Sequence, residues 1–248
     1  MKSIALRILG ALLAVAVWWI ATDLLSSSSP ILGAMGPANT WTALTNLLTQ
    51  GNLLDSISVS LQRLFIGLGL ATVTGIALGL LLGWLKWAEQ LTSVPVQFLR
   101  MISPLAWMPV AIVVFGIGTP PVVFLIFIAA IWPIALATSS GVRQLEPKWH
   151  LLAKSFGASA RERLVHIVIP GIRSNVLTGI RLALAVSWIV LVPAEMLGVD
   201  SGLGYSILNS RDQLAYDQLA AIMLTIGLLG FIIDWIAQKL FAIWSRTK

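Results

Sequence analysis

The stretch MISPLAWMPVAIVVFGIGTPPVVFLIFIAAIWPIALATSSGV runs from Met101 to Val142 and contains no charged side chain in 42 residues. A single helix of that length would be about 63 Å long, roughly twice the hydrocarbon thickness of a bilayer. We therefore expect two membrane-spanning helices in this stretch. The break is expected between Gly116 and Pro121, because glycine disfavours a helix and proline removes an amide donor.

The composition of the whole chain is that of a membrane protein. Its 248 residues are 58% hydrophobic and 10% charged, and the mean hydropathy is +0.91. Soluble domains carry about 25% charged residues, so this composition excludes an ordinary soluble enzyme, and its hydrophobicity excludes a disordered chain. Because the chain has no cysteine, a disulfide framework and a thiolate metal site are excluded as well.

Four further hydrophobic stretches bring the expected number of spans to six. They are residues 8–22, 64–85, 174–197 and 214–241. A cleaved signal peptide is an alternative interpretation of the first stretch, because basic residues precede about 15 apolar ones. The prediction is an all-α polytopic membrane protein with six transmembrane helices.

Small residues recur at every fourth position of the span over residues 64–85. This spacing places them on one face of the helix, where a second helix can approach closely. We interpret the strip as a packing surface, and its members are Gly67, Ala71, Gly75, Gly79 and Gly83.

The charge distribution supports six spans with both termini in the cytosol. In that topology, 13 of the 16 Lys and Arg residues fall in the inner segments 1–7, 84–100, 139–173 and 239–248. The outer segments hold only Arg211, as the positive-inside rule requires. The chain is thus expected to form one transmembrane domain over residues 1–248.

The longest inner loop, residues 143–173, reads RQLEPKWHLLAKSFGASARERLVHIVIPGIR. We expect a short amphipathic helix that begins near Pro147 and ends at Gly157, where glycine permits a left-handed conformation. The outer loops are expected at about residues 23–56 and 198–213.

A second short helix is expected in the same loop. Ser159 and Glu162 have the spacing of a capping box, and Pro170 is expected to end the helix. An alternative role for the loop is to grip anionic lipid through its basic residues, Lys148, Lys154, Arg161 and Arg163.

The spacing from Gly157 onward resembles the cytoplasmic EAA loop of ABC-importer permeases. That motif reads Glu-Ala-Ala, three residues, Gly, nine residues, Ile, one residue, and Leu-Pro. Here nine residues separate Gly157 from Ile167, and Pro170 follows at the expected position, whereas residues 151–153 read Leu-Leu-Ala. The resemblance implies that ten residues couple the chain to an ATPase: Leu151, Leu152, Ala153, Phe156, Gly157, Ser159, Arg161, Glu162, Ile167 and Pro170.

The resemblance extends over roughly residues 55–245. Segments such as RMISPLAWMPVAIVVFGIG and LALAVSWIVLVPAEMLGVDSGLGYSI look like the branch of permeases for nitrate, bicarbonate, sulfonates and taurine, with residues 191–205 most similar to nitrate and bicarbonate members.

The family resemblance also implies an architecture and partners. It implies the type I ABC-importer fold in the bacterial inner membrane and pairing with a second copy of the chain. Two cytosolic ATP-binding subunits would hold ATP and Mg, and an outer solute-binding protein would deliver the cargo. In the family, the first helix of the loop docks into a groove of the ATP-binding subunit.

The chain has no sequence motif for its own energy source or for covalent catalysis. No Lys follows a Gly, so a P-loop is absent, and neither HExxH nor Gly-x-Ser-x-Gly occurs. Energy must come from a partner or from an ion gradient. A gradient-driven secondary transporter and an intramembrane enzyme are therefore the alternatives, although the inverted repeats of a carrier and the clustered nucleophile of an enzyme are not found.

Six residues in the predicted spans are candidates for a translocation path: Arg63, Arg181, Ser187, Trp188, Glu195 and Met196. An ionisable residue in mid-bilayer costs about 2.5–3.5 kcal/mol, which makes it a candidate for function. Structural alternatives are snorkelling for Arg63 and hydrogen bonds to backbone carbonyls for Arg181. Glu195 would repel an anion, so we expect it to brace an outer gate or to pair with an arginine, and Asp234 to pair with a basic residue.

Overall fold

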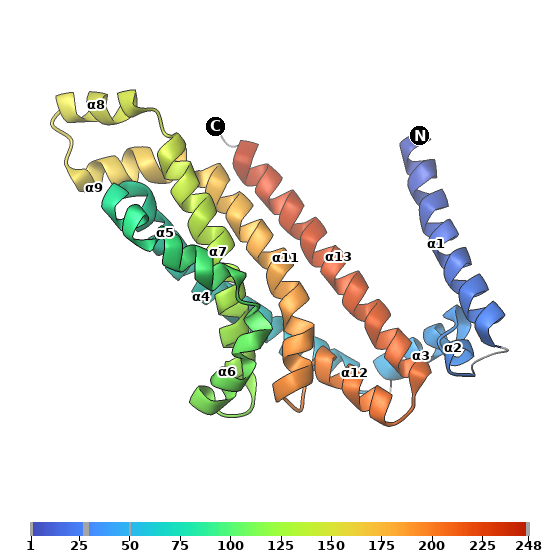
Figure 1. Ribbon diagram of the computed structural model, residues 1–248. Helices are drawn as coiled ribbons and strands as arrows, with labels where there is room; N and C mark the ends of the chain where they lie inside the picture. The colour runs from blue at the N-terminus through green and yellow to red at the C-terminus, as the bar shows by residue number, and fades with distance from the viewer. Residues whose placement is uncertain (1, 27–29, 50, 247–248) are drawn as a thin grey trace. The chain divides into compact units, whose positions relative to one another are not determined.

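The computed structural model describes residues 2–26, 30–49 and 51–246, and these ranges contain helices and no strand (Figure 1). The contacts divide the chain into two compact units, Met1–Ser60 with Ser201–Leu229 and Leu61–Asp200 with Gly230–Lys248. The helices are α1 (Lys2–Ser26), α2 (Pro30–Ala34), α3 (Pro37–Thr49), α4 (Leu53–Trp84), α5 (Lys86–Met101), η1 (Pro104–Trp107), α6 (Met108–Phe115), α7 (Thr119–Gln144), α8 (Pro147–Ser155), α9 (Ala160–Arg163), η2 (Leu164–Val168), α10 (Ile169–Gly171), α11 (Arg173–Gly198), α12 (Leu203–Asp212) and α13 (Tyr216–Arg246).

Four of these helices are long and apolar enough to cross a bilayer: α4, α7, α11 and α13. They coincide with four of the predicted spans, and the predicted break lies between the end of α6 and the start of α7. Residues 8–22 are helical within α1, but the apolar part of that helix, Leu12–Asp23, is shorter than a span. The count of six and the cytosolic termini stay predictions.

The expected third span, residues 101 to about 116, contains only η1 and the eight-residue α6, and α5 before it lies in the segment expected on the inner side. Helix α5 meets η1 and α6 at an angle of 89°, so the pair counts as a fifth span only if the bend is included. The bend lies at Ile102 and Ser103, whose ψ angles of 125° and 130° are extended. Pro104 explains it, because the ring of a proline disfavours helical backbone in the preceding residue.

The unit formed by Met1–Ser60 and Ser201–Leu229 contains the predicted outer loop 23–56 and residues 201–213 of the second predicted outer loop, and both loops include helices. Residues 23–56 contain α2 and α3, and residues 198–213 contain α12. The hydroxyl groups of Ser56 and Ser206 are 3.0 Å apart, and Ser60 Oγ accepts a hydrogen bond of 2.9 Å from the Leu203 amide. These contacts tie the start of α4 to α12.

In the other unit, the glycine strip of α4 packs directly on α7, as predicted. A Cβ atom built on Gly67 would lie 2.6 Å from Ile126 Cγ2, and one on Gly79 would lie 2.5 Å from the Ala135 carbonyl oxygen. Real Cβ atoms do not approach other atoms so closely. The backbone of α4 at its glycines therefore lies directly against atoms of α7. The fully buried side chains of this unit include Leu64, Leu125, Ile126, Ile134 and Leu191.

Candidate functional site

The first helix of the inner loop ends as the sequence predicts. Gly157 has a φ of +75°, and its amide donates to the Lys154 carbonyl at 3.0 Å. The Ala158 amide donates to the Ala153 carbonyl at 2.9 Å. This pair of hydrogen bonds is a Schellman motif, which needs a left-handed residue at Gly157.

The capping box of the second helix is also present. The Ser159 amide donates to Glu162 Oε2 at 2.7 Å, and the Glu162 amide donates to Ser159 Oγ at 3.2 Å. The hydrogen bond from the Ser159 backbone, followed by that from its side chain, lowers the pKa of the exposed Glu162 carboxyl. The turn between α8 and α9 is therefore held at both ends by specific hydrogen bonds.

The expectation that Pro170 ends the second helix is wrong. A π-helical turn over Leu164–Val168 precedes the proline, and the helical path continues through α10 to Gly171. A π turn changes the backbone register before a residue that cannot donate a hydrogen bond, so the proline is accommodated. Only Ile172 separates this path from α11.

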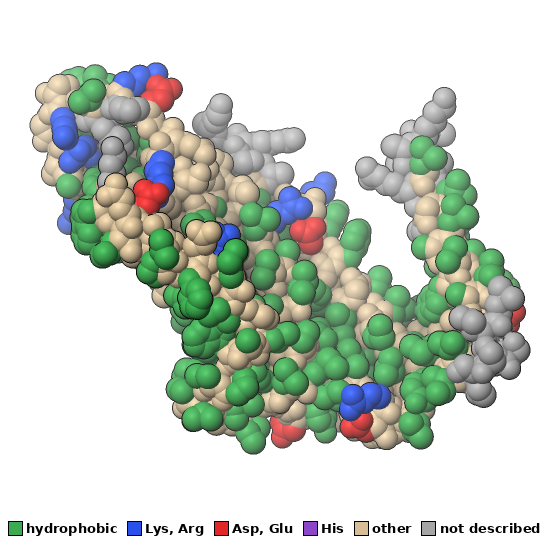
Figure 2. Space-filling model, in the orientation of Figure 1, with side chains coloured by type: hydrophobic (Ala, Val, Ile, Leu, Met, Phe, Trp, Pro, Cys, Tyr) green, Lys and Arg blue, Asp and Glu red, His purple; other side chains and the backbone are tan. Residues whose placement is uncertain are grey.

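The outer surface of α8 combines apolar and basic side chains. Leu151, Leu152 and Phe156 are 66%, 51% and 81% exposed. Figure 2 shows basic and hydrophobic side chains gathered over α8 and α9. A short helix with an apolar face and basic neighbours is suited to a groove with acidic edges on another protein.

The far end of the loop is anchored in the helix bundle. Val168 and Ile172 are buried with Val142 of α7, and a set of partly buried side chains surrounds them. The guanidinium of Arg163 lies 5.9 Å from the centroid of the Trp84 ring at the end of α4. The loop thus contacts the end of α4 near Trp84, the end of α7 and the start of α11, and the surrounding residues are Leu80, Trp84, Leu145, Leu164 and Val176.

Two of the predicted path residues form a buried ion pair. Arg63 Nη1 donates to Glu195 Oε1 at 2.8 Å, and the two side chains are 3% and 0% exposed. Arg63 Nε also donates to Thr119 Oγ1 at 3.2 Å. Arg63 therefore does not snorkel, whereas the expected pairing of Glu195 with an arginine is confirmed.

A second pair joins Arg181 of α11 to Asp234 of α13. Arg181 Nε lies 3.3 Å from Asp234 Oδ1, and both side chains are 46% exposed. Gln238 Nε2 donates to the other oxygen of Asp234 at 2.6 Å. The expectation that Asp234 pairs with a basic residue is confirmed, and the partner of Arg181 is a carboxylate rather than the backbone carbonyls expected for it.

The six predicted path residues do not form a single site. Arg181 and Glu195 are 14 residues apart on α11, which is about 21 Å along the helix. The indole nitrogen of Trp188 faces α13, where a Cβ on Gly230 would lie 2.5 Å from it. Ser187 is fully buried, and its hydroxyl has no hydrogen-bond partner in the described part of the chain. Met196 is half-buried in α11.

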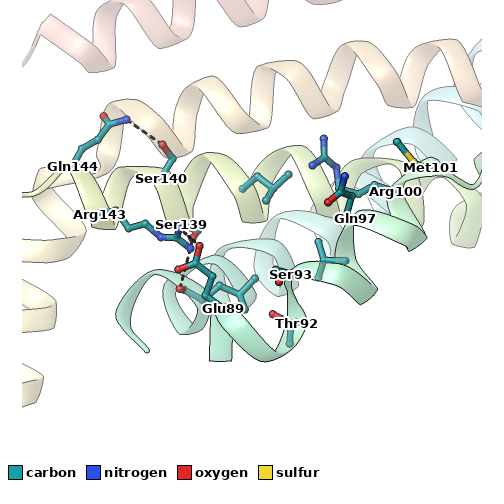
Figure 3. Close-up of a pocket in the computed structure, with 13 residues that line it drawn as sticks. Glu89, Thr92, Ser93, Gln97, Arg100, Met101, Ser139, Ser140, Arg143 and Gln144 are labelled. Carbon is teal, nitrogen blue, oxygen red and sulfur yellow. Dashed lines mark hydrogen bonds and ion pairs between the residues drawn. The ribbon is translucent and has the colours of Figure 1, made fainter. Parts of the chain in front are cut away.

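The structure adds a cavity that the sequence reasoning missed. It lies between α5 and α7 and has a volume of about 620 Å³ (Figure 3). Glu89 and Arg143 form an ion pair at one end, and Arg143 also donates to Ser139 Oγ at 3.1 Å. The polar residues that line it are Glu89, Thr92, Ser93, Gln97, Arg100, Ser139, Ser140, Arg143 and Gln144.

A periodic signal for this cavity was present in the sequence. The four other polar residues of α5 that line the cavity follow Glu89 at intervals of 3, 4, 8 and 11 residues, so that all five share one face of a helix. The prediction treated residues 84–100 only as an inner segment, and a search for helical periodicity there would have found the polar face.

Comparisons with known proteins identify the family of the chain. A family model described as "Binding-protein-dependent transport system inner membrane component" matches residues 71–242. The putative aliphatic sulfonates transport permease protein SsuC of Escherichia coli is 32% identical over 232 residues, which cover 94% of this chain and 88% of SsuC. The nitrate import permease protein NrtB of Synechococcus elongatus is 35% identical over 181 residues, which cover 72% of this chain and 65% of NrtB.

The fold is also shared with a solved structure. The MetNI methionine ABC transporter in an inward-facing conformation matches with a TM-score of 0.65 and 15% identity, over 78% of this chain and 96% of that chain. The architecture is thus the all-α fold of a type I ABC-importer permease. Together with the match over residues 71–242, this shows that the chain belongs to the binding-protein-dependent inner-membrane components, the permeases of ABC importers.

Proposed function

We propose that the chain is the membrane subunit of an ATP-driven importer for a small anion such as nitrate, with bicarbonate, a sulfonate or taurine as the other candidates. It acts as a homodimer with two cytosolic ATP-binding subunits and receives its cargo from a periplasmic or lipid-anchored solute-binding protein. ATP and Mg²⁺ bind to the partner subunits, and this chain carries out no covalent chemistry.

The observation that carries this proposal is the construction of the inner loop. Helix α8 presents Leu151, Leu152 and Phe156 outward, while Val168 and Ile172 hold the other end of the loop against the bundle. Movement of a partner bound to α8 would therefore reach α4, α7 and α11 through packed side chains. A bound partner shifts the balance between an open and a closed gate only if it binds the two states with different affinity. Nucleotide-dependent closure of the ATP-binding subunits would supply that difference.

The anionic cargo is supported by the names of similar proteins and by charge. NrtB is named for nitrate and SsuC for aliphatic sulfonates. The cavity between α5 and α7 has two arginines and one carboxylate in its lining. A net positive lining favours anions over cations.

Reconstitution into liposomes tests the function. Uptake of nitrate should require the ATP-binding subunits, ATP and the cognate binding protein. Uptake by this chain alone, driven by an ion gradient, would favour the secondary transporter instead. Parallel assays with bicarbonate, taurine and an alkanesulfonate identify the cargo.

A variant of Gly157 tests the coupling role of the loop. Gly157→Val should uncouple ATP hydrolysis from uptake, because a β-branched residue is strained at a φ of +75°. Gly157→Asn is the matched control, since asparagine tolerates this conformation. Normal uptake by Gly157→Val would contradict the coupling role.

A further inference from the structure

The cavity between α5 and α7 is lined by polar side chains of both helices, and Ser139 and Arg143 of α7 lie toward Glu89 of α5 (Figure 3). On α7, four polar residues share a face over the last two turns of a membrane-spanning helix. Polar groups in such a helix face a water-filled space or another polar surface, because burial against lipid is costly. The opposite side of α5 is apolar and exposed, and includes Leu91, Val94 and Phe98.

The charges in the cavity do not cancel. Glu89 is engaged by Arg143, whose other nitrogen donates to Ser139 Oγ and, at 3.4 Å, to the Leu82 carbonyl. Arg100 lines the same cavity, and no carboxylate pairs with it in residues 51–246. The exposed guanidinium of Arg100 is therefore the unbalanced charge, about 16 Å along α5 from Glu89.

The remaining lining groups are suited to an anion. The hydroxyls of Thr92 and Ser93 donate to the Ala88 and Gln90 carbonyls, and Gln144 Nε2 donates to Ser140 Oγ at 3.0 Å. The side-chain donors that remain for a ligand are the Ser140 hydroxyl, the Gln97 amide and the second N–H of Gln144. A small oxyanion would fit with several waters in about 620 Å³. A guanidinium with neighbouring hydroxyl and amide donors binds oxyanions by charge-assisted hydrogen bonds.

We propose that this cavity is the inner-side anion site of the transport path, and that Arg100 is the residue that selects anions there. Arg143 has a positioning role, because Glu89 already neutralises it. The inference rests on the proposed function, since it takes the cargo to be an anion. It extends that function by placing a binding step beside the inner loop, at the end of α7 from which the loop departs.

The natural absence of cysteine allows a direct test. Ser93→Cys places a thiol in the cavity, and Gln90→Cys places one on the same helix at a position that does not line the cavity. Each variant is purified with its ATP-binding subunits and treated with an anionic or a cationic methanethiosulfonate reagent. The mass of the permease chain reports the rate of modification.

The expected result is a preference for the anionic reagent that is about tenfold greater at Ser93→Cys than at Gln90→Cys, because the unpaired charge of Arg100 lies about 10 Å along α5 from Ser93 and about 15 Å from Gln90. Adding Arg100→Gln should abolish the difference, and Arg100→Lys should retain it. Nitrate should slow modification at Ser93→Cys only. Equal preferences at the two positions, or a preference that survives Arg100→Gln, would overturn the proposal.

Two safeguards keep the result interpretable. If Ser93→Cys does not assemble, Ser140→Cys probes the same cavity from α7.

The outcome is also independent of the transport assay. If the complex takes up nitrate but the cavity shows no preference for the anionic reagent, this inference is refuted and the proposed function is retained. If the cavity prefers the anionic reagent and nitrate slows the modification, but the complex does not take up nitrate, the anion site is supported and nitrate is excluded as the cargo.

Discussion

Helix α11 carries two ion pairs that differ in burial and therefore in what they can do. Near one end, Glu195 meets Arg63 with almost no exposed surface, whereas near the other end Arg181 meets Asp234 with both side chains 46% exposed. A buried pair is costly to break because either partner left alone is an uncompensated charge. The second pair is accessible at the surface of the chain, and polar contacts between membrane helices contribute about 0.6 kcal/mol on average. The first pair is suited to fixing helices in place, and the second to contacts that form and break.

Removing one partner of the buried pair should have the largest effect. We expect Arg63→Gln to destabilise the protein by about 3–5 kcal/mol, because Glu195 would remain buried without its cation. Equilibrium unfolding in mixed micelles with increasing dodecyl sulfate measures the change. The double variant Arg63→Met with Glu195→Leu should regain much of the loss, and a double variant no better than the single one would contradict this account.

The third member of the buried network should contribute less. Thr119→Val keeps the shape of the side chain but removes the acceptor of the hydrogen bond from Arg63 Nε. We expect a loss of about 1 kcal/mol, since a single hydrogen bond is removed. Thr119→Ser is the control and should unfold like the parent protein in the same micelle assay.

The half-exposed pair should tolerate substitution. Arg181→Gln is expected to change the unfolding free energy by about 0.5 kcal/mol, as for other exposed pairs. A loss as large as that of Arg63→Gln would show that burial does not distinguish the two pairs.

A third carboxylate, Glu162 in the inner loop, extends the comparison to full exposure. Because its pKa is lowered in the folded loop, its stabilising effect is present above the ordinary pKa of glutamate and is lost as the pH falls through the folded value. Hydrogen exchange over residues 159–164, corrected for intrinsic rates, should show less protection at pH 4 than at pH 7. Glu162→Gln keeps the capping hydrogen bond without the charge, so its protection should depend less on pH.

The parts of the molecule set by local composition were predictable from the sequence. The four long helices follow from uncharged runs, and the turn at Gly157 and the capping box at Ser159 follow from residue types at fixed spacing. Pro104 was visible too, but the surrounding apolar run concealed the bend that it causes.

The site contacts depended on information that the sequence does not carry. Arg63 and Glu195 are 132 residues apart, so no local pattern pairs them. The cavity needs α5 and α7 to face each other, and the π turn before Pro170 is a backbone adjustment rather than a residue signature. Long-range packing decides such features.

The seam between α4 and α7 has a consequence for how this protein tolerates mutation. At Gly67, Gly79 and Gly83 even a methyl group would lie within 2.6 Å of atoms of α7, whereas Gly69 has no neighbour within 4 Å. Saturation mutagenesis should therefore record forbidden positions at multiples of four along α4, with a permissive site beside them. The two helices are closely packed along this seam, so in the proposed transport cycle a change between open and closed gates would take place at other helix contacts.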